Sequence, residues 1–175
     1  MRRIAGGEKY SLWLMPTEEA YVRLGRILGD LSMRHGAPEF APHVTLLGGC
    51  VGSPQEMIRR SACLAAGLRP LTVRLEGIGF LDEYFRCLFV HAVLTEPLRK
   101  AYQAACRAFG HEHEPAFMPH LSLLYGNYPR GLKEAVVAEL GLRLDVQFKV
   151  KSLHLYRTSG EVGRWRGVGR FGLRF

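Results

Sequence analysis

Residues 38–49 read PEFAPHVTLLGG, and residues 115–126 read PAFMPHLSLLYG. The second stretch follows the first at an offset of 77 residues and aligns with it without a gap, with 7 identical pairs among 12. A repeat at a fixed offset indicates that one structural unit occurs twice in a chain. The duplication therefore predicts a protein built from two similar halves, in which His43 and His120 occupy the same place.

The flanks of the two stretches also repeat in type. Before each stretch comes an apolar run typical of a strand, residues 10–15 and 87–94. A helical pattern follows each run and ends at a glycine, Gly36 in the first half and Gly110 in the second. The elements expected after each stretch are a further helix, 54–66 or 131–140, and two strands, 71–80 and 85–94 in the first half and 144–156 and 165–173 in the second.

These elements predict an α+β fold in a single domain that spans residues 1–175. We expect two lobes related by a pseudo-twofold axis, each with an antiparallel sheet flanked by helices. The sheets should exchange strands between the halves, so the lobes are intertwined and no boundary divides them.

Each stretch presents a histidine and a hydroxyl group on one face of a short strand. Residues two apart in a strand project from the same side, so His43 points with Thr45, and His120 points with Ser122. If the pseudo-twofold axis brings the two strands together, one concave site receives two imidazoles and two hydroxyls. The hydroxyls can donate hydrogen bonds to phosphate oxygens while the imidazoles lie on opposite sides of phosphorus. This set of side chains favours chemistry on a small phosphodiester.

Hydrolysis of a cyclic phosphodiester requires two proton transfers, one from the attacking water and one to the departing sugar oxygen. Histidine, with an ordinary pKa of about 6.5, can serve in either role near neutral pH. A single histidine after proline in a buried strand is more often a hydrogen-bonded core residue. Two histidines in matched surroundings favour catalysis by His43 and His120. The repeat itself does not say which of them is the acid.

A metal site is the main chemical alternative. Neither histidine has a carboxylate or thiolate beside it, which disfavours zinc or iron, and we expect no metal and no other cofactor. Residues 111–114, HEHE, are richer in metal ligands, but they precede Pro115 and are more simply interpreted as a polar loop beside the site. The remaining histidines and the cysteines lack such a context, and we expect structural or surface roles for His35, His91 and His154 and reduced thiols at Cys50, Cys63, Cys87 and Cys106.

Composition narrows the class of protein. The 175 residues carry a formal net charge of +8, with the basic residues scattered along the chain, and 47% are hydrophobic. The charge favours an anionic ligand, and scattered arginines alone are weak support for nucleic-acid binding. No apolar run is long enough to cross a membrane and no secretory signal is present, so we expect a cytoplasmic protein that does not bind membranes.

Through HVTL at residues 43–46 and HLSL at residues 120–123, the sequence resembles the two-histidine phosphoesterase superfamily, which is defined by paired Hx(T/S)x motifs. Within that superfamily it is most similar to the cyclic phosphodiesterases of plants and yeast, which act on small cyclic phosphates in tRNA-splicing metabolism. The likeness extends to YSLWLMP at residues 10–16 and LHLYRT at residues 153–158. The resemblance implies a bilobal fold with the active site in the cleft between the lobes.

The resemblance also implies an activity and a role for each site residue. It implies hydrolysis of ADP-ribose 1″,2″-cyclic phosphate to ADP-ribose 1″-phosphate and of nucleoside 2′,3′-cyclic phosphates to nucleoside 2′-phosphates. By position, His43 would be the general acid and His120 the general base. Thr45 and Ser122 would hold the phosphate oxygens. The aromatic residues expected to line the site are Trp13 and Tyr125. The disulfides of the plant members have no counterpart here, because no cysteine lies near the C-terminus.

Two alternatives stay open beside the small-molecule phosphodiesterase. One is an RNA end-processing or 2′,5′-RNA ligase-like enzyme that acts on oligonucleotide cyclic-phosphate ends, which needs an extended basic and aromatic groove. The other is an RNA-binding protein that has lost catalysis, which the intact motifs disfavour. We expect the partner to be a small nucleotide-type cyclic phosphate, with RNA ends as the further candidate, and the protein to be a monomer.

Overall fold

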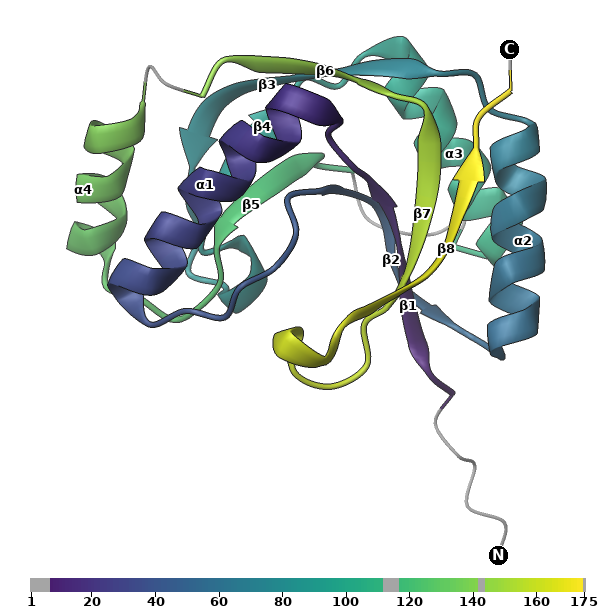
Figure 1. The fold of residues 1–175 in the computed structure, drawn as a ribbon, viewed down its shortest axis with the longest axis horizontal. Helices are drawn as coiled ribbons and strands as arrows, with labels where there is room; N and C mark the ends of the chain where they lie inside the picture. Colours follow the sequence, from purple (N-terminus) through teal and green to yellow (C-terminus); the bar gives the residue numbers. More distant parts are fainter. Residues whose placement is uncertain (1–6, 112–116, 142–143, 175) are drawn as a thin grey trace, which may run out of the picture.

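One curved antiparallel sheet of eight strands forms the frame of the described part of the protein (Figure 1). The structure, a computed structural model, describes residues 7–111, 117–141 and 144–174. The strand order across the sheet is β6-β3-β4-β5-β2-β1-β7-β8. The strands are β1 (Lys9–Leu14), β2 (Val44–Val51), β3 (Leu71–Gly79), β4 (Leu88–Ala92), β5 (His120–Leu124), β6 (Val146–Val150), β7 (Ser152–Arg157) and β8 (Arg166–Gly172).

The sequence repeat appears in the sheet as two halves of four strands. The two motif strands, β2 and β5, are neighbours at the centre, where Val44 pairs with Leu121. The next strands outward are β1 and β4, which are the first strands of the two repeats. Beyond each of them lies a strand from the other repeat. Strand β3 pairs with β4, and β7 pairs with β1, so each half of the sheet contains strands from both repeats.

The expected α+β class and antiparallel pairing are confirmed, with two differences in detail. The two expected sheets are halves of one continuous sheet, because β2 and β5 are hydrogen-bonded to each other. The single strand expected over residues 144–156 is two strands, and Lys151 separates β6 from β7. Val150 and Ser152, on either side of Lys151, are both buried, so the alternation of buried and exposed residues continues through Lys151. At this residue the chain stops pairing with β3 and begins to pair with β1.

Across the described ranges, four helices pack on the apolar face of the sheet. They are α1 (Glu18–His35), α2 (Pro54–Ala66), α3 (Glu96–Phe109) and α4 (Arg130–Leu140). Figure 1 shows α1 and α4 over one half of the sheet and α2 and α3 over the other. Gly36 and Gly110, at the ends of α1 and α3, adopt the left-handed conformation that favours glycine, with φ of 63° and 72°. Both expected helix ends are therefore confirmed.

Alternation along β1 shows how the strands separate core from site. Tyr10, Leu12 and Leu14 are buried in the core, with at most 1% of their surface exposed. The intervening residues, including Ser11 and Trp13, project to the opposite face. That second face carries the polar and aromatic side chains described below.

A buried lysine fixes the turn between β3 and β4. Lys133 of α4 is only 2% exposed, and its Nζ donates hydrogen bonds to the Leu81 carbonyl (3.1 Å) and to Asp82 Oδ1 (2.5 Å). This hydrogen bond and ion pair hold the pKa of the Asp82 carboxyl below its ordinary value. The short helical turn η1 (Tyr84–Arg86) follows directly, so Lys133 sets the position of the residues that η1 carries.

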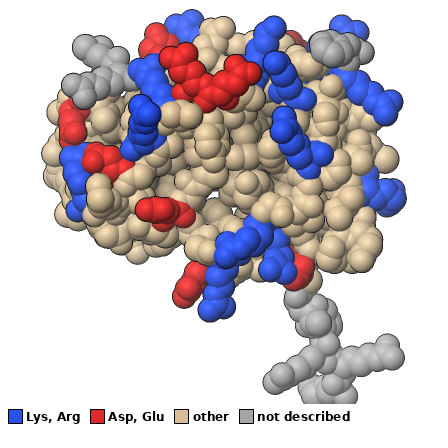
Figure 2. Space-filling model, viewed as in Figure 1, with Lys and Arg blue, Asp and Glu red and all other residues tan. Residues whose placement is uncertain are grey.

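The surface shown in Figure 2 has no single basic stripe among its described residues. Lys and Arg are scattered over this face with Asp and Glu among them. Within the described ranges, no helix is long and apolar enough to cross a membrane. Cys50, Cys63, Cys87 and Cys106 are not joined by disulfides; Cys63 is exposed and the other three are buried.

Candidate active site

The centre of the sheet holds a cavity of about 470 Å³. Strands β2 and β5 place the two histidine motifs against this cavity, because they are neighbours at the centre of the sheet. All six residues singled out in the sequence line it: Trp13, His43, Thr45, His120, Ser122 and Tyr125.

Both imidazoles are held by the same backbone contact. His43 Nδ1 lies 2.7 Å from the Ala41 carbonyl oxygen, and His120 Nδ1 lies 2.9 Å from the Met118 carbonyl oxygen. A carbonyl oxygen can only accept, so each Nδ1 carries the proton and donates it. In the neutral form, Nε2 of each ring is left with a free lone pair. The repeat therefore supplies two identically oriented imidazoles, each able to accept or, once protonated, to give a proton through Nε2.

His43 is the more enclosed of the two. It is 4% exposed and stacks on Trp13, with ring centroids 3.5 Å apart and an interplanar angle of 8°. Tyr156 of β7 also stacks on Trp13, at 3.8 Å. Burial lowers the pKa of His43 to about 4, and the hydrogen bond to Ala41 only partly opposes this. His43 is therefore neutral at physiological pH in the ligand-free site.

His120 keeps more contact with solvent. Its ring lies 5.1 Å from that of Phe89 on β4. Phe89 pairs with Ser122 on β5 in the same way that Trp13 on β1 pairs with Thr45 on β2. Burial lowers the pKa of His120, and the positive charge of Arg86 lowers it further. Because the smaller ring of Phe89 takes the place of the stacked indole, the two halves give their histidines different surroundings.

The two hydroxyl groups also differ. Ser122 is 5% exposed, and its Oγ donates a 3.1 Å hydrogen bond to the Phe85 carbonyl. Thr45 is half-buried, and no hydrogen bond of its hydroxyl is found in the described part of the chain. Thr45 can donate to an incoming phosphate at once, whereas Ser122 must first turn its proton away from Phe85.

Tyr125 closes one side of the cavity. It is 4% exposed and stacks on Phe40 with ring centroids 3.9 Å apart. Burial raises the pKa of its phenol, so the group stays protonated. Phe85 and Trp165 pack edge-on against it, at 5.2 and 6.0 Å. This wall is apolar enough to receive a flat organic group.

Besides three glycines, the cavity is lined by six residues that the sequence did not single out: Lys9, Ser11, Phe85, Arg86, Thr158 and Trp165. One signal was present for the cations, because Lys9 and Arg86 are themselves separated by the repeat offset of 77 residues. Alternation from Trp13 would also have included Ser11. Trp165 follows the turn η2 (Val162–Arg164), and no sequence pattern connects it with the two motifs.

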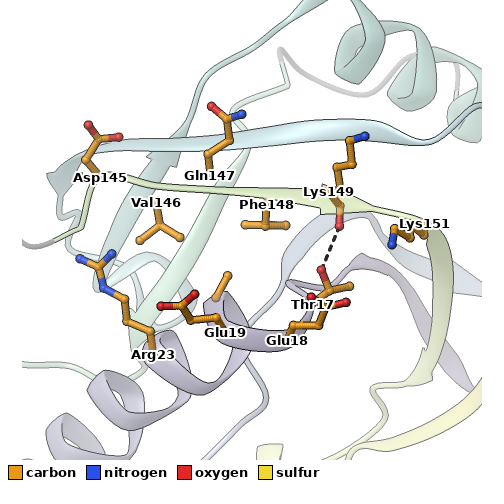
Figure 3. A pocket seen from close by; sticks show the side chains of 11 residues that line it. Thr17, Glu18, Glu19, Arg23, Asp145, Val146, Gln147, Phe148, Lys149 and Lys151 are labelled. Atoms are coloured by element: carbon orange, nitrogen blue, oxygen red, sulfur yellow. Dashed lines mark hydrogen bonds between the residues drawn. The ribbon is translucent and has the colours of Figure 1, made fainter.

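A second cavity, of about 460 Å³, lies between the first turn of α1 and strand β6 (Figure 3). Thr17 Oγ1 donates to the Lys149 carbonyl across it, at 3.4 Å, and Figure 3 shows Glu19 and Arg23 nearby. Glu18 and Asp145 also line it, but it contains no histidine, and neither motif reaches it. It therefore lacks groups that exchange protons near neutral pH, and the central cavity is the better candidate.

The other histidines lie outside the motif pair. His91 is exposed on β4, and His154 is half-buried on β7, where Nε2 lies 3.0 Å from Ser152 Oγ. The His35 ring packs edge-on against Tyr128, at 6.1 Å. Of the HEHE segment, residues 112–114 lie outside the described residues. Over the ranges that the structure covers, no three His, Cys, Asp or Glu side chains are grouped as a metal site.

Comparison with known proteins relates the chain to phosphoesterases. The sequence profile of the 2′-5′ RNA ligase superfamily matches residues 26–161. A protein of Arabidopsis thaliana named cyclic phosphodiesterase is 26% identical over 156 residues, which cover 87% of this chain and 86% of the relative. A crystal structure of a Thermus thermophilus protein superposes with a TM-score of 0.68 at 16% identity, covering 95% of this chain and 98% of that one. Escherichia coli LigT complexed with 3′-AMP gives a TM-score of 0.62 at 16% identity, covering 98% and 100%.

Proposed function

The chain belongs to the 2′-5′ RNA ligase superfamily, and on that premise we propose that it is a cyclic phosphodiesterase that uses His43 and His120 as its proton carriers. The proposed substrates are ADP-ribose 1″,2″-cyclic phosphate and nucleoside 2′,3′-cyclic phosphates. The products are ADP-ribose 1″-phosphate and nucleoside 2′-phosphates. The Arabidopsis relative named cyclic phosphodiesterase supports this class of reaction.

One observation carries the proposal. Both imidazoles are tied through Nδ1 to a backbone carbonyl and line one cavity together with Thr45 and Ser122. Fixing the tautomer through Nδ1 leaves Nε2 as the only nitrogen of each ring that can take or give a proton at the substrate. Two such groups meet the requirement of hydrolysis for one base and one acid.

The proposed reaction consists of one exchange of bonds at phosphorus and two proton transfers. A water oxygen forms a bond to phosphorus while one imidazole Nε2 takes a proton from that water. The bond from phosphorus to one ring oxygen breaks, and the other imidazole, protonated, gives its proton to that oxygen. Thr45 and Ser122 donate hydrogen bonds to the non-bridging oxygens as negative charge grows on them. Correctly placed acid and base groups contribute roughly 10²- to 10⁴-fold each.

The two surroundings favour an assignment of roles in the ligand-free enzyme. Burial against Trp13 keeps His43 neutral, which suits a base, whereas His120 is closer to solvent and more easily protonated. We therefore propose His43 as the base and His120 as the acid, which reverses the roles that the family resemblance implies. A bound phosphate anion raises the pKa of both rings, because opposite charge favours the protonated form.

A substrate panel tests the activity. In the presence of EDTA, the wild type should hydrolyse adenosine 2′,3′-cyclic phosphate and ADP-ribose 1″,2″-cyclic phosphate, and His43→Ala and His120→Ala should each lose at least about 100-fold in kcat, of the order expected for a general acid or base. Loss of turnover in EDTA contradicts the proposed mechanism. Turnover confined to an oligonucleotide with a cyclic-phosphate end points instead to RNA end processing.

A good leaving group tests the roles. A 2′-deoxynucleoside 3′-(4-nitrophenyl phosphate) has no neighbouring hydroxyl group, so water attacks phosphorus and nitrophenolate leaves without needing a proton. It should therefore restore activity only to the variant that lacks the acid. We expect rescue of His120→Ala and not of His43→Ala. Rescue in the opposite order assigns the acid to His43.

A further inference from the structure

The two halves of the cavity differ at the residue that ends each motif. Gly48 corresponds to Tyr125 through the 77-residue offset. Tyr125 puts a buried phenol ring into one wall, whereas Gly48 has no side chain. A Cβ at Gly48 would already lie 3.7 Å from both Ser11 Oγ and Thr45 Cγ2, so a larger side chain there would fill the space beside Thr45. The cavity therefore continues past Gly48 toward Ser11 of β1.

This extension has a polar and well-ordered lining. Ser11 Oγ and Thr158 Oγ1 are 3.2 Å apart and hydrogen-bonded. The backbone N–H of Thr158 donates to the Lys9 carbonyl (2.8 Å), and the N–H of Lys9 donates to Ser159 Oγ (2.8 Å). The start of β1 and the end of β7 are thus fixed to each other. Lys9 lines the cavity from this backbone, and alternation along β1 places its side chain on the same face as Ser11 and Trp13.

Lys9 supplies a positive charge that neighbouring carboxylates do not neutralise. Arg86, the other cation that lines the cavity, is paired with Glu83 at 2.6 Å. The carboxylate next to Lys9 in sequence, Glu8, is occupied by Arg157 (3.0 Å) and by the Tyr10 hydroxyl (2.6 Å). No ion pair of Lys9 is found among the residues that the structure describes. An ammonium group in this position attracts an anion into the open end of the cavity.

We propose that Lys9 determines substrate specificity by binding a second anionic group of the substrate, a phosphate or diphosphate separate from the cyclic phosphate that reacts. This inference rests on the proposed function, since the reacting phosphate must lie between His43 and His120. The nucleotide part then extends past Gly48, and its second phosphate meets Lys9. The preferred substrates are cyclic phosphodiesters that carry a further phosphate rather than plain nucleoside cyclic phosphates.

Two substrates that differ by one phosphate test this proposal. Adenosine 2′,3′-cyclic phosphate and 5′-phosphoadenosine 2′,3′-cyclic phosphate are compared on the wild type, Lys9→Gln and Lys9→Arg. Lys149→Gln, which removes the same charge from an exposed position on β6 at the far edge of the sheet, is the matched control. We expect Lys9→Gln to lower kcat/KM for the 5′-phosphorylated substrate about tenfold, mainly through KM, as a lost hydrogen bond to a charged group does.

Three further comparisons distinguish loss of the contact between Lys9 and the second phosphate from a general structural effect of the substitution. The plain substrate should stay within about twofold in all variants, because it has no group that reaches Lys9. Lys9→Arg should restore most of the loss. Raising the salt from about 0.1 M to about 1 M, which shortens the Debye length from about 10 Å to about 3 Å, should reduce the advantage of the second phosphate in the wild type.

Equal losses on both substrates, or no loss on either, overturn the proposal while leaving the phosphodiesterase activity intact. If the wild type turns over neither substrate, the proposed function fails, and the Lys9 site is then judged by binding alone. Calorimetry with adenosine 2′-phosphate and adenosine 2′,5′-bisphosphate should still show that the wild type binds the bisphosphate more tightly. The Lys9→Gln substitution should remove this difference in affinity. Equal affinities of the two ligands for the wild type overturn it.

Discussion

The enclosed position of His43 predicts that this one side chain makes the stability of the protein depend on pH. Its pKa is about 4 in the folded protein and about 6.5 in an unfolded chain. The folded state therefore binds fewer protons than the unfolded state between these values. The stability that follows from a neutral His43 is complete above about pH 7 and is lost as the pH falls from about 6.5 toward about 4.

The size of the effect follows from the two pKa values. Each pKa unit corresponds to about 1.36 kcal/mol, so a shift of about 2.5 units corresponds to about 3.4 kcal/mol when the pH is well below 4. At pH 5, about 2 kcal/mol of the free energy of unfolding is already lost relative to pH 7.5. This is a large part of the stability of a typical domain, which is about 5–15 kcal/mol.

His43→Asn isolates this contribution. The asparagine amide can still donate to the Ala41 carbonyl, as Nδ1 does, but it has no proton to gain. Urea unfolding of wild type and variant at pH 7.5, 6.0 and 5.0 gives the difference in free energy of unfolding at each pH, and the other titrating groups cancel. The control is His91→Asn, which removes an exposed imidazole from β4.

We expect the stability advantage of the wild type over His43→Asn to shrink by about 2 kcal/mol between pH 7.5 and pH 5. The His91→Asn protein should lose stability in parallel with the wild type. Curves for the wild type and His43→Asn that stay parallel over this range would refute the reasoning, because His43 would then titrate alike in the folded and unfolded chain.

Three further outcomes follow from the same structure. Trp13→Ala should lower the free energy of unfolding by about 3–5 kcal/mol, as removal of a buried aromatic ring does. It should also raise the pKa of His43 in an NMR titration. An unchanged pKa would mean that the indole does not shield the imidazole from water. The profile of kcat/KM against pH should be bell-shaped with its optimum below pH 6.5, since burial lowers the pKa of both imidazoles, and an optimum above pH 7 would contradict this. Lys133→Ala should lower Tm in calorimetry by several degrees, because it leaves the Leu81 carbonyl without its hydrogen-bond donor at a cost of about 1–3 kcal/mol. An unchanged Tm would show that the turn between β3 and β4 is stable without the lysine.

The repeat explains why much of this site could be predicted from the sequence. Pro42 and Pro119 start the two motifs alike, and alternation along a strand places His43 with Thr45 and His120 with Ser122. Both pairs line one cavity because β2 and β5 are neighbours at the centre of the sheet. Local patterns suffice for features of this kind, since each depends on only a few consecutive residues.

The features that distinguish the two halves could not be predicted in this way. Trp13 stacks on His43, and Tyr156 covers the other face of the indole, because β7 from the second repeat pairs with β1 of the first. The break at Lys151, which allows this pairing, is not visible in the pattern of buried residues. The difference in pKa between two histidines with the same motif arises from these long-range contacts, and a single sequence does not specify them.

The central claim is that two imidazoles hydrolyse a cyclic phosphodiester by attack of water. The most direct measurement is ³¹P NMR of adenosine 2′,3′-cyclic phosphate incubated with the wild type and EDTA in ¹⁸O-water. We predict complete conversion to the 2′-phosphate with one ¹⁸O atom on phosphorus, and no conversion over the same time by the protein in which both His43 and His120 are replaced by alanine. A cyclic phosphate that persists with the wild type, or equal rates for the wild type and the double variant, would contradict the claim.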